Sequence, residues 1–318
     1  MSKSKKTSSE TGIRKRGILE TIWRYRVLEL MCLPAVLFFF MFSYMPMPGI
    51  YVAFVKYNYR KGIFGSKFIG LDNFKFLAES GKLFDLTKNT ILYNLAFILL
   101  GNFLAILVAI LLNEMRSKMF KKVSQTLMFL PYFISQVLVG LLVYSLLNYD
   151  TGFVNEILVA LGKAKWQPYS NPSVWPVLIV LIHLWQQTGY NSVVYFAAIC
   201  GIDAEIIEAA KVDGANAFQR IRYIILPSLK PTIVILLLFA LGGIVRGNFG
   251  LFWNVIGSNS VLYPTTDIIE TFVYRATMSD FNFSTASAVG FYQSLVGFVI
   301  VMLANLAVKK IDPDYSLF

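Results

Sequence analysis

The chain has 318 residues, of which 56% are hydrophobic and only 15% are charged, and its mean hydropathy is +0.60. Soluble domains carry about 25% charged residues, so this composition excludes a soluble globular protein and a disordered chain, and two cysteines exclude a disulfide scaffold. A net charge of +11 would point to nucleic acid in a soluble protein, but in a membrane protein it reports orientation, because cytoplasmic loops collect Lys and Arg. The sequence therefore predicts an integral membrane protein.

The first 27 residues are predicted to be a cytoplasmic tail. Residues 1–11 are rich in Ser, Lys and Thr, and we expect them to be disordered. Between Ile13 and Arg26, apolar and basic residues alternate in a way that suits a basic amphipathic helix on the inner leaflet, with a solvated tail as the alternative. The Met-Pro-Met-Pro run at 45–48 lacks the small residues of a cleavage site, so we expect an uncleaved first span rather than a signal peptide.

Six stretches are long and apolar enough to cross a membrane, since a span needs about 20 residues. We expect helices, because helices satisfy their own backbone in lipid and no strand-length alternation indicates a barrel. Basic residues before the first span, after the second, after the fourth and after the sixth place both termini in the cytoplasm, although the basic loop 56–88 departs from this rule. The transmembrane domain, 28–318, has expected spans at 28–50, 91–112, 127–147, 174–200, 232–252 and 289–308.

The fourth expected span carries polar and aromatic residues in its middle. Such side chains are costly in lipid and usually face a cavity or a partner helix. Gln187 and Asn191 lie four residues apart and therefore share a helix face. The alternative is that the amides bond across helices as packing. The candidates for a solute path on this span are Trp185, Gln186, Gln187, Tyr190 and Asn191.

The loop between the fourth and fifth spans, residues 203–231, predicts a short helix–turn–helix in the cytoplasm. Asp203 is a plausible N-cap for a helix over 205–212, and Gly214 permits a tight turn. A second helix is expected over 215–225, ended by Pro227. Small alanines at 209 and 210 allow a bulky partner to approach closely. The segment therefore predicts docking into a groove of another protein, or else an ordinary hairpin between two spans.

The fifth and sixth expected spans add the polar candidates Arg246, Asn248, Asn254, Tyr292 and Gln293. If the fifth helix begins near residue 232, Arg246 lies about 21 Å along it, in the outer half of the bilayer. Its guanidinium can bind a carboxylate of a solute, snorkel outward, or pair with a carboxylate on another subunit.

Other polar or reactive residues carry weaker signals. Trp253 fits the aromatic belt at the membrane interface. His183, the single histidine, is expected to pack, and Cys32 and Cys200 are expected to be small apolar fillers. No clustering of His, Cys or carboxylates predicts a metal site.

The cytoplasmic loop resembles the EAA loop of ATP-binding-cassette (ABC) importer permeases. The shared pattern is Glu-Ala-Ala, three residues, Gly, nine residues, Ile, one residue, Leu-Pro. In that family the loop forms a coupling helix seated in a cleft of the ATPase subunit, and Asp213 falls within the same segment. The matching positions here are Glu208, Ala209, Ala210, Gly214, Ile224, Leu226 and Pro227. Residues 68–74, 88–90, 265–288 and 314–318 are similar to the sugar and complex-oligosaccharide branch.

The resemblance implies an all-α, type I importer permease with six transmembrane helices in the bacterial plasma membrane. It implies a heterodimer with a sister permease, two ATPase subunits and an extracytoplasmic solute-binding protein. The sequence has no phosphate-binding Gly-x-x-x-x-Gly-Lys-Ser/Thr, since Gly81-Lys82 and Gly162-Lys163 lack both the upstream glycine and the hydroxyl. We therefore expect no enzymatic activity and no cofactor in this chain, with ATP and Mg²⁺ held by the partner subunits.

The expected function is uptake of an oligosaccharide, acidic or derived from a polysaccharide, by ATP-driven alternating access. Sugars present hydroxyls and flat apolar faces, which suit the hydrogen-bonding and aromatic candidates named above. Import of a non-sugar solute is one alternative. A second is a secondary transporter, which would require buried carboxylates or broken helices at the midplane. A third, a membrane-embedded enzyme, is disfavoured by the single histidine.

Overall fold

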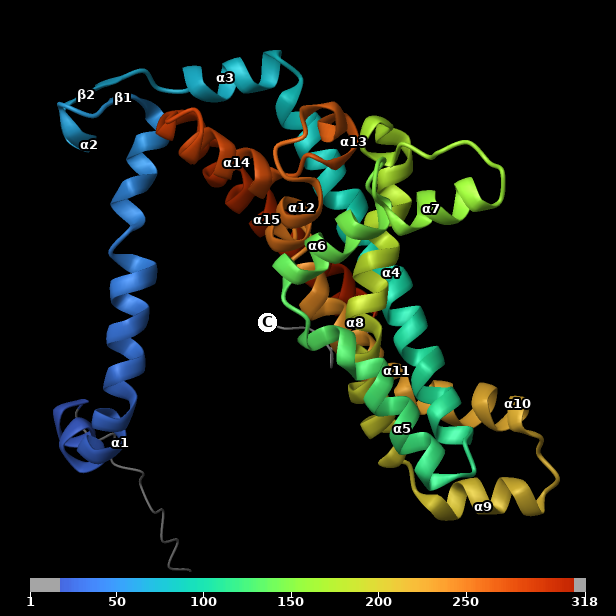
Figure 1. Ribbon diagram of the computed structural model, residues 1–318. Coiled ribbons are helices and arrows are strands. Elements are labelled where there is room, and N and C mark those ends of the chain that lie inside the picture. Colours follow the sequence, from blue (N-terminus) through green and yellow to red (C-terminus); the bar gives the residue numbers. More distant parts are fainter. Residues whose placement is uncertain (1–17, 312–318) are drawn as a thin grey trace, which may run out of the picture. The chain divides into compact units, whose positions relative to one another are not determined.

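The computed structural model describes residues 18–311, and this part of the chain is mostly helical, with connecting turns and loops and one small two-stranded hairpin (Figure 1). The chain divides into two compact units, residues 1–50 and residues 51–318. The disorder predicted for residues 1–11, the first part of the amphipathic helix and the resemblance at 314–318 lie outside the described residues.

The described part of the first unit, residues 18–50, is a single helical segment. Helix α1 (Ile18–Phe39) continues into a π-helical turn, η1 (Phe40–Tyr44), and the 3₁₀ segment η2 (Met47–Phe54) leads into the second unit. The backbone of α1 bends at Tyr25, so the first turns are set apart from the apolar segment Tyr25–Phe54. Large apolar side chains along this segment are not buried by the first unit itself.

The second unit begins with an antiparallel hairpin, which the all-helical prediction did not include. Strands β1 (Val55–Asn58) and β2 (Ser66–Phe68) pair with Val55 opposite Phe68, and the short helix α2 (Gly62–Gly65) connects them. Helix α3 (Asp72–Glu79) follows, and Gly81, with a φ of 69°, turns the chain into α4 (Lys82–Glu114). This 33-residue helix contains the second expected span and extends beyond it at the N-terminal end.

The third expected span, 127–147, is not one straight helix. Helix α5 (Lys118–Phe129) and the 3₁₀ turn η3 (Leu130–Phe133) meet α6 (Gln136–Leu147) at an angle of 96°. A proline in η3 and a new N-cap explain the bend: the Ser135 hydroxyl accepts a hydrogen bond from the backbone N–H of Leu138 and starts α6 afresh.

Helix α7 (Phe153–Ala160) and two 3₁₀ turns, η4 (Pro168–Ser170) and η5 (Pro172–Val174), lead into α8 (Trp175–Cys200). Helix α8 coincides closely with the fourth expected span. It packs along α4, and Figure 1 shows these two helices side by side through the middle of the second unit.

The fifth expected span, 232–252, is also wrong as a continuous helix. Helix α9 (Ala204–Val212) precedes a segment made of α10 (Ala217–Arg220), the π-helical turn η6 (Ile221–Ile225) and α11 (Leu226–Gly242). The chain then leaves helical geometry at Gly243 and resumes in α12 (Phe249–Ile256), because Asn248 caps a new helix with its side-chain oxygen on the N–H of Leu251. Arg246 therefore lies in a helix break, and the depth of 21 Å derived from a continuous helix does not apply.

The last elements are the 3₁₀ turn η7 (Ser260–Leu262), α13 (Tyr263–Thr266), α14 (Ile269–Met278) and α15 (Phe283–Ile311). The sixth expected span lies inside α15. Three buried clusters hold the unit together: one around Trp175 and Phe252, one around Leu86 and Val289, and one around Tyr195 and Leu229.

Within residues 18–311, four helical segments are long and apolar enough to cross a membrane, or five if the bent pair α5–α6 counts as one. The four are Tyr25–Phe54, Lys82–Glu114, Ala217–Gly242 and Phe283–Lys310. Helix α8 has 26 residues but is not among them, because its polar residues dilute the apolar run.

Candidate functional site

The segment that is predicted to be cytoplasmic and to couple to a partner folds as a capped helix and a tight turn. The Asp203 carboxylate accepts a hydrogen bond from the N–H of Glu205 at 3.0 Å and begins α9. At the other end Gly214 has a φ of +81°, and the next residue returns a hydrogen bond from its N–H to the carbonyl of Ala210 at 2.9 Å. Glycine adopts this backbone conformation without strain, which explains in physical terms why the turn has a glycine at this position.

The second arm of this segment differs from the prediction. It begins at Ala217, where Asn216 and Gln219 form a capping box, and Pro227 does not end it. The helix runs on through α11 because the turn before the proline widens into the π-helix η6. In that wider turn the proline ring avoids the clash with the carbonyl four residues back that would break a regular α-helix.

Arg220 ties this hairpin to the membrane helices. Its guanidinium donates to the Glu114 carboxylate at the end of α4, with an N–O distance of 3.2 Å, and to the Ala215 carbonyl at 3.1 Å. The side chains of Arg220 and Glu114 are 15% and 31% exposed. Sequence reasoning missed Glu114, because nothing near it in the chain shows that Arg220 folds back onto it. The pair connects α10 directly to the longest helix of the unit.

One face of the hairpin is free within the chain. Glu208, Ala209, Asp213 and Gly214 are all exposed, while Ala210 is half-buried. Large apolar side chains beside them are exposed too, with Val212 at 88%, Phe218 at 68% and Tyr223 at 70%. Leu226 and Pro227 are also exposed. Apolar side chains exposed around small residues are typical of a surface that a partner covers.

The polar cluster on α8 separates into structural and free members. Gln186, only 2% exposed, accepts a hydrogen bond from Gln136 at 3.0 Å and donates to the carbonyl of Ile134 at 2.9 Å. It therefore stabilises the bend between η3 and α6. This is the role in helix packing that the sequence analysis gave as the alternative to a place on the solute path. A Cβ at Gly189 would lie 1.8 Å from the Met128 carbonyl oxygen, so α8 and α5 touch backbone to backbone here.

The other α8 candidates are more accessible. Tyr190 is 42% exposed and stacks on Tyr132, with ring centroids 4.1 Å apart and planes 6° apart. Trp185 is 44% exposed, and Gln187 and Asn191 are half-buried. His183 stacks on Phe97 at 3.8 Å, in keeping with a packing role.

The break after α11 is held from three helices. Asn94 of α4 donates to the carbonyls of Ile244 and Arg246 at 2.8 and 3.0 Å. Gln293 of α15 donates to the carbonyl of Val245 and to Glu270 of α14, each at 2.6 Å. The same Glu270 oxygen accepts from the N–H of Gly247 at 2.6 Å. Gln293 is thus a brace for the break, and Asn94 and Glu270 are functional candidates that the sequence analysis did not select.

The remaining candidates from the fifth and sixth expected spans have mixed outcomes. Asn248 is a helix cap and Tyr292 accepts a hydrogen bond from Thr87 at 3.2 Å, so both serve the fold. The Arg246 side chain is exposed. Trp253 packs against Tyr274, with ring centroids 4.5 Å apart.

Asn254 lines a cavity of about 580 Å³ between α6, α12 and the segment before α8. Tyr144, Tyr169 and Asn259 line it as well, and burial raises the pKa of Tyr169 to about 12, so its hydroxyl stays protonated. This cavity combines aromatic rings with amides and hydroxyls, the groups that a sugar requires. The tyrosines lie far from Asn254 in sequence, which is why the sequence analysis did not include them.

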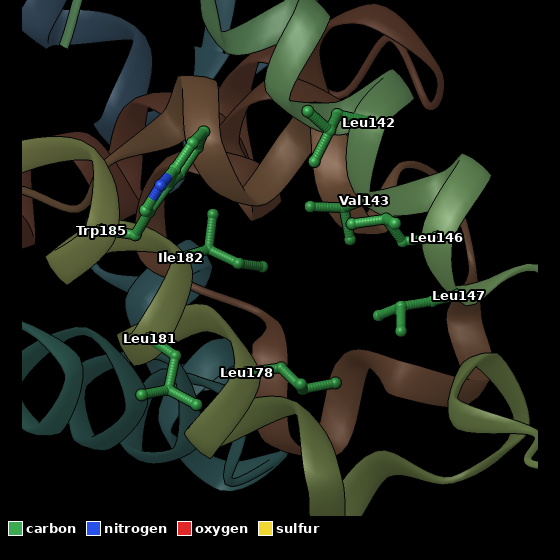
Figure 2. Close-up of a pocket in the computed structure, with 8 residues that line it drawn as sticks. All are labelled: Leu142, Val143, Leu146, Leu147, Leu178, Leu181, Ile182 and Trp185. Carbon is green, nitrogen blue, oxygen red and sulfur yellow. The ribbon is translucent and has the colours of Figure 1, made fainter. Parts of the chain in front are cut away.

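A second cavity, of about 430 Å³, lies between α6 and α8 (Figure 2). Figure 2 shows leucine, valine and isoleucine side chains pointing into it, with the Trp185 ring at one end. Because its walls offer almost no hydrogen-bonding group, this cavity cannot by itself hold a saccharide. It fits a groove covered by lipid or by an apolar side chain of another subunit.

The chain is similar to known proteins in sequence and in fold. Residues 101–315 match the family model described as "Binding-protein-dependent transport system inner membrane component". The chain is 36% identical over 301 residues to the polygalacturonan/rhamnogalacturonan transport system permease protein YteP of Bacillus subtilis (strain 168), covering 95% of this chain and 93% of that protein.

Solved structures agree in fold. The chain superimposes with a TM-score of 0.83 and 34% identity on a chain of the bacterial alginate ABC transporter in complex with an alginate pentasaccharide-bound periplasmic protein, covering 92% of this chain and 98% of that one. A second structure, of a bacterial ABC transporter involved in import of the acidic polysaccharide alginate, gives a TM-score of 0.84 at 33% identity, covering 93% of this chain and 99% of that one.

Proposed function

Because this chain belongs to the binding-protein-dependent transport system inner membrane components, as a permease of the type I sugar ABC importers, we propose that it carries an acidic oligosaccharide into the cytoplasm by ATP-driven alternating access. The observation that carries the proposal is the coupling segment: an exposed capped helix, α9, on a hairpin bonded to the end of α4 through Arg220 and Glu114.

The mechanical step follows from this geometry. A partner that grips the exposed face around Glu208, Ala209 and Gly214 moves α9 as one body, because the helix is capped at both ends. The movement reaches α4 through the Arg220–Glu114 pair and reaches α11 through the continuous helix Ala217–Gly242. Asp213, Leu226 and Pro227 are proposed to take part in the same segment, which performs no covalent chemistry. Nucleotide need shift the balance between outward-open and inward-open states by only a few kcal/mol.

The proposed assembly contains a sister permease, two ATPase subunits that hold ATP and Mg²⁺, and an extracytoplasmic binding protein that delivers the solute. Both termini are proposed to lie in the cytoplasm of a bacterial cell. The apolar walls of the α6–α8 cavity support these partners, since they need neighbours other than water.

The proposed solute path includes fewer of the candidate residues than the sequence analysis named. It keeps the accessible candidates Trp185, Gln187, Tyr190, Asn191 and Arg246 and the cavity that contains Asn254. It leaves out Gln186, Asn248, Tyr292 and Gln293, whose side chains already bond within the fold. Asn254 also donates a hydrogen bond, to the Gly250 carbonyl of its own helix at 2.7 Å, but it is kept because it lines the cavity. The exposed guanidinium of Arg246 supports an acidic solute, and the alginate transporter is described as importing an acidic polysaccharide.

The test is ATPase activity of the reconstituted complex in lipid, with and without the loaded binding protein, comparing wild type with Gly214→Asp. The matched control is Gly162→Asp, because Gly162 also has a positive φ, of +70°, and open space around it. We expect stimulation by the loaded binding protein to be lost in Gly214→Asp and kept within about twofold in the control, with both complexes assembled. Equal stimulation in both variants would contradict the coupling role.

One observation favours a second candidate, a gradient-driven transporter. The chain breaks at 243–248 beside Glu270, whose second carboxylate oxygen is buried without a hydrogen-bond partner. Ion-coupled transporters place broken helices and buried carboxylates at their binding sites. Uptake into ATP-free vesicles driven by a proton or sodium gradient would support this candidate, whereas uptake that strictly requires ATP would exclude it.

A further inference from the structure

A polar pocket of about 760 Å³ lies on the inner side of the coupling hairpin, and the Arg220–Glu114 pair that ties α10 to α4 forms part of its wall. Its walls are residues 113–116 at the end of α4, Ile207 and Lys211 of α9, and Ala217 and Arg220 of α10. Figure 1 shows α9 and α10 extending beside the ends of α4 and α5.

The pocket carries excess positive charge. Of its charged residues, Arg220 and Glu114 neutralise each other across 3.2 Å. Within residues 18–311, Arg116 and Lys211 form no ion pair, and both are exposed. An anion is therefore the complement of the pocket. Arginine presents a planar fork of donors that suits a phosphate, and lysine adds a point charge.

The position of the pocket favours one source for that anion. The apolar helix α4 ends at Glu114, beside the pocket. In the membrane placement of the proposed function, this end of α4 points to the lipid headgroups of the cytoplasmic leaflet. Ile207 and Lys211 face the pocket, whereas Glu208, Ala209 and Val212 lie on the exposed face of the same helix. A partner docked on that exposed face is separated from the pocket by α9 itself.

We propose that this pocket binds the phosphate of an anionic phospholipid from the cytoplasmic leaflet, with Arg116 and Lys211 as its cationic contacts. The assignment rests on the membrane placement of the proposed function. Basic pockets at the cytoplasmic ends of transmembrane helices have the charge and depth to hold such headgroups. A lipid held here bridges α4 and α9 and stiffens the hairpin that the coupling step moves.

The experiment is native mass spectrometry of the whole complex, released from mild detergent and titrated with phosphatidylglycerol or phosphatidylcholine. The variants are Arg116→Gln, Lys211→Gln and the double substitution. The matched control is Lys118→Gln, an exposed cation nearby that does not line the pocket. We expect wild type and control to retain phosphatidylglycerol in preference to phosphatidylcholine, and the double variant to bind phosphatidylglycerol about tenfold more weakly.

Two outcomes would overturn the assignment. Equal phosphatidylglycerol binding by the double variant and the control would show that the pocket is not the lipid site. Displacement of the bound lipid by inorganic phosphate would identify a free anion as the ligand instead. Because the readout is lipid mass, either outcome is independent of stimulated ATPase activity, so failure of this site and failure of the proposed function can be told apart.

Discussion

The buried amide of Gln186 shows how much a single side chain contributes to this fold. It satisfies the Ile134 carbonyl and the Gln136 amide at the point where the chain bends by 96°. Removing it deprives these two part-buried groups of their hydrogen-bond partner, which costs about 1–3 kcal/mol. We therefore expect Gln186→Ala to lower the stability of the purified complex by that amount in thermal unfolding. Gln187→Ala, at the half-buried neighbour, should change it by less than about 0.5 kcal/mol, and equal losses would contradict the bracing role.

Arg246 gives the second prediction at the residue scale. Its side chain is exposed, while its backbone is fixed by Asn94. We expect Arg246→Gln to raise the concentration of an acidic oligosaccharide needed for half-maximal uptake by about tenfold, because a charge-assisted hydrogen bond is lost. Uptake of a neutral oligosaccharide of the same length should stay unchanged. Arg246→Lys keeps the charge and should recover part of the loss, and an equal effect on both solutes would assign Arg246 to structure instead.

Residue types at the candidate site could be predicted, but their partners could not. The sequence identified Gln186, Asn248 and Gln293 as polar residues in an apolar setting, yet all three bond to backbone exposed by a bend or break. The bonds of Gln186 and Gln293 depend on long-range geometry that periodicity does not report, whereas the Asn248 cap is local. Arg220 and Glu114 illustrate the same limit, because they are 106 residues apart and meet only in the folded chain.

At the scale of elements, the break between α11 and α12 is a fixed feature of the fold rather than a loose linker. Asn94, Gln293 and Glu270 hold its backbone from three helices. A Cβ at Gly247 would lie 2.5 Å from both the Glu270 carboxylate and the Ile268 side chain. A methyl group at position 247 would therefore displace the end of the Glu270 side chain, which itself holds the break.

This packing predicts a large loss of stability for Gly247→Ala and a small change in stability for Gly242→Ala. The first must displace Glu270, which costs about 1–3 kcal/mol as in other overpacked sites. The second places its methyl group in open space, with nothing within 4 Å, at the end of α11. Thermal unfolding of the two variants side by side checks the difference. A stable Gly247→Ala protein with unchanged unfolding would show that the break is able to relax.

The helical elements were largely predictable, and their interruptions were not. The second and sixth expected spans lie inside α4 and α15, and the fourth coincides closely with α8. The apolar run continues through Ile244 and Val245, which hides the break, although the glycine pair at 242–243 and the cap residue Asn248 mark it. At Pro227 the sequence predicted an end where the structure has none. The helix continues past the proline because a π-helical turn precedes it.

At the scale of the whole molecule, the coupling helix α9 has two faces with different roles. Val212 is 88% exposed on the outer face, whereas Ile207 lines the polar pocket on the inner face. Five residues along an α-helix turn the side chain by about 140°, so these two positions point in widely different directions. If an ATPase subunit docks on the outer face, as proposed, only one of the two positions should meet it.

Cysteine cross-linking distinguishes the two faces in the assembled complex. The native Cys32 and Cys200, both exposed, are first replaced by serine, and a single cysteine is then placed at Val212 or at Ile207. With a short bifunctional thiol–amine reagent, we expect Val212→Cys to give a product of the permease joined to the ATPase, at a yield that changes when ATP is added. Ile207→Cys should give little of that product, because its side chain faces α4. Equal yields from the two positions would mean that the ATPase contacts both faces of α9. Coupling by a grip on the outer face alone would then be contradicted, and the movement would have to separate α9 from α10.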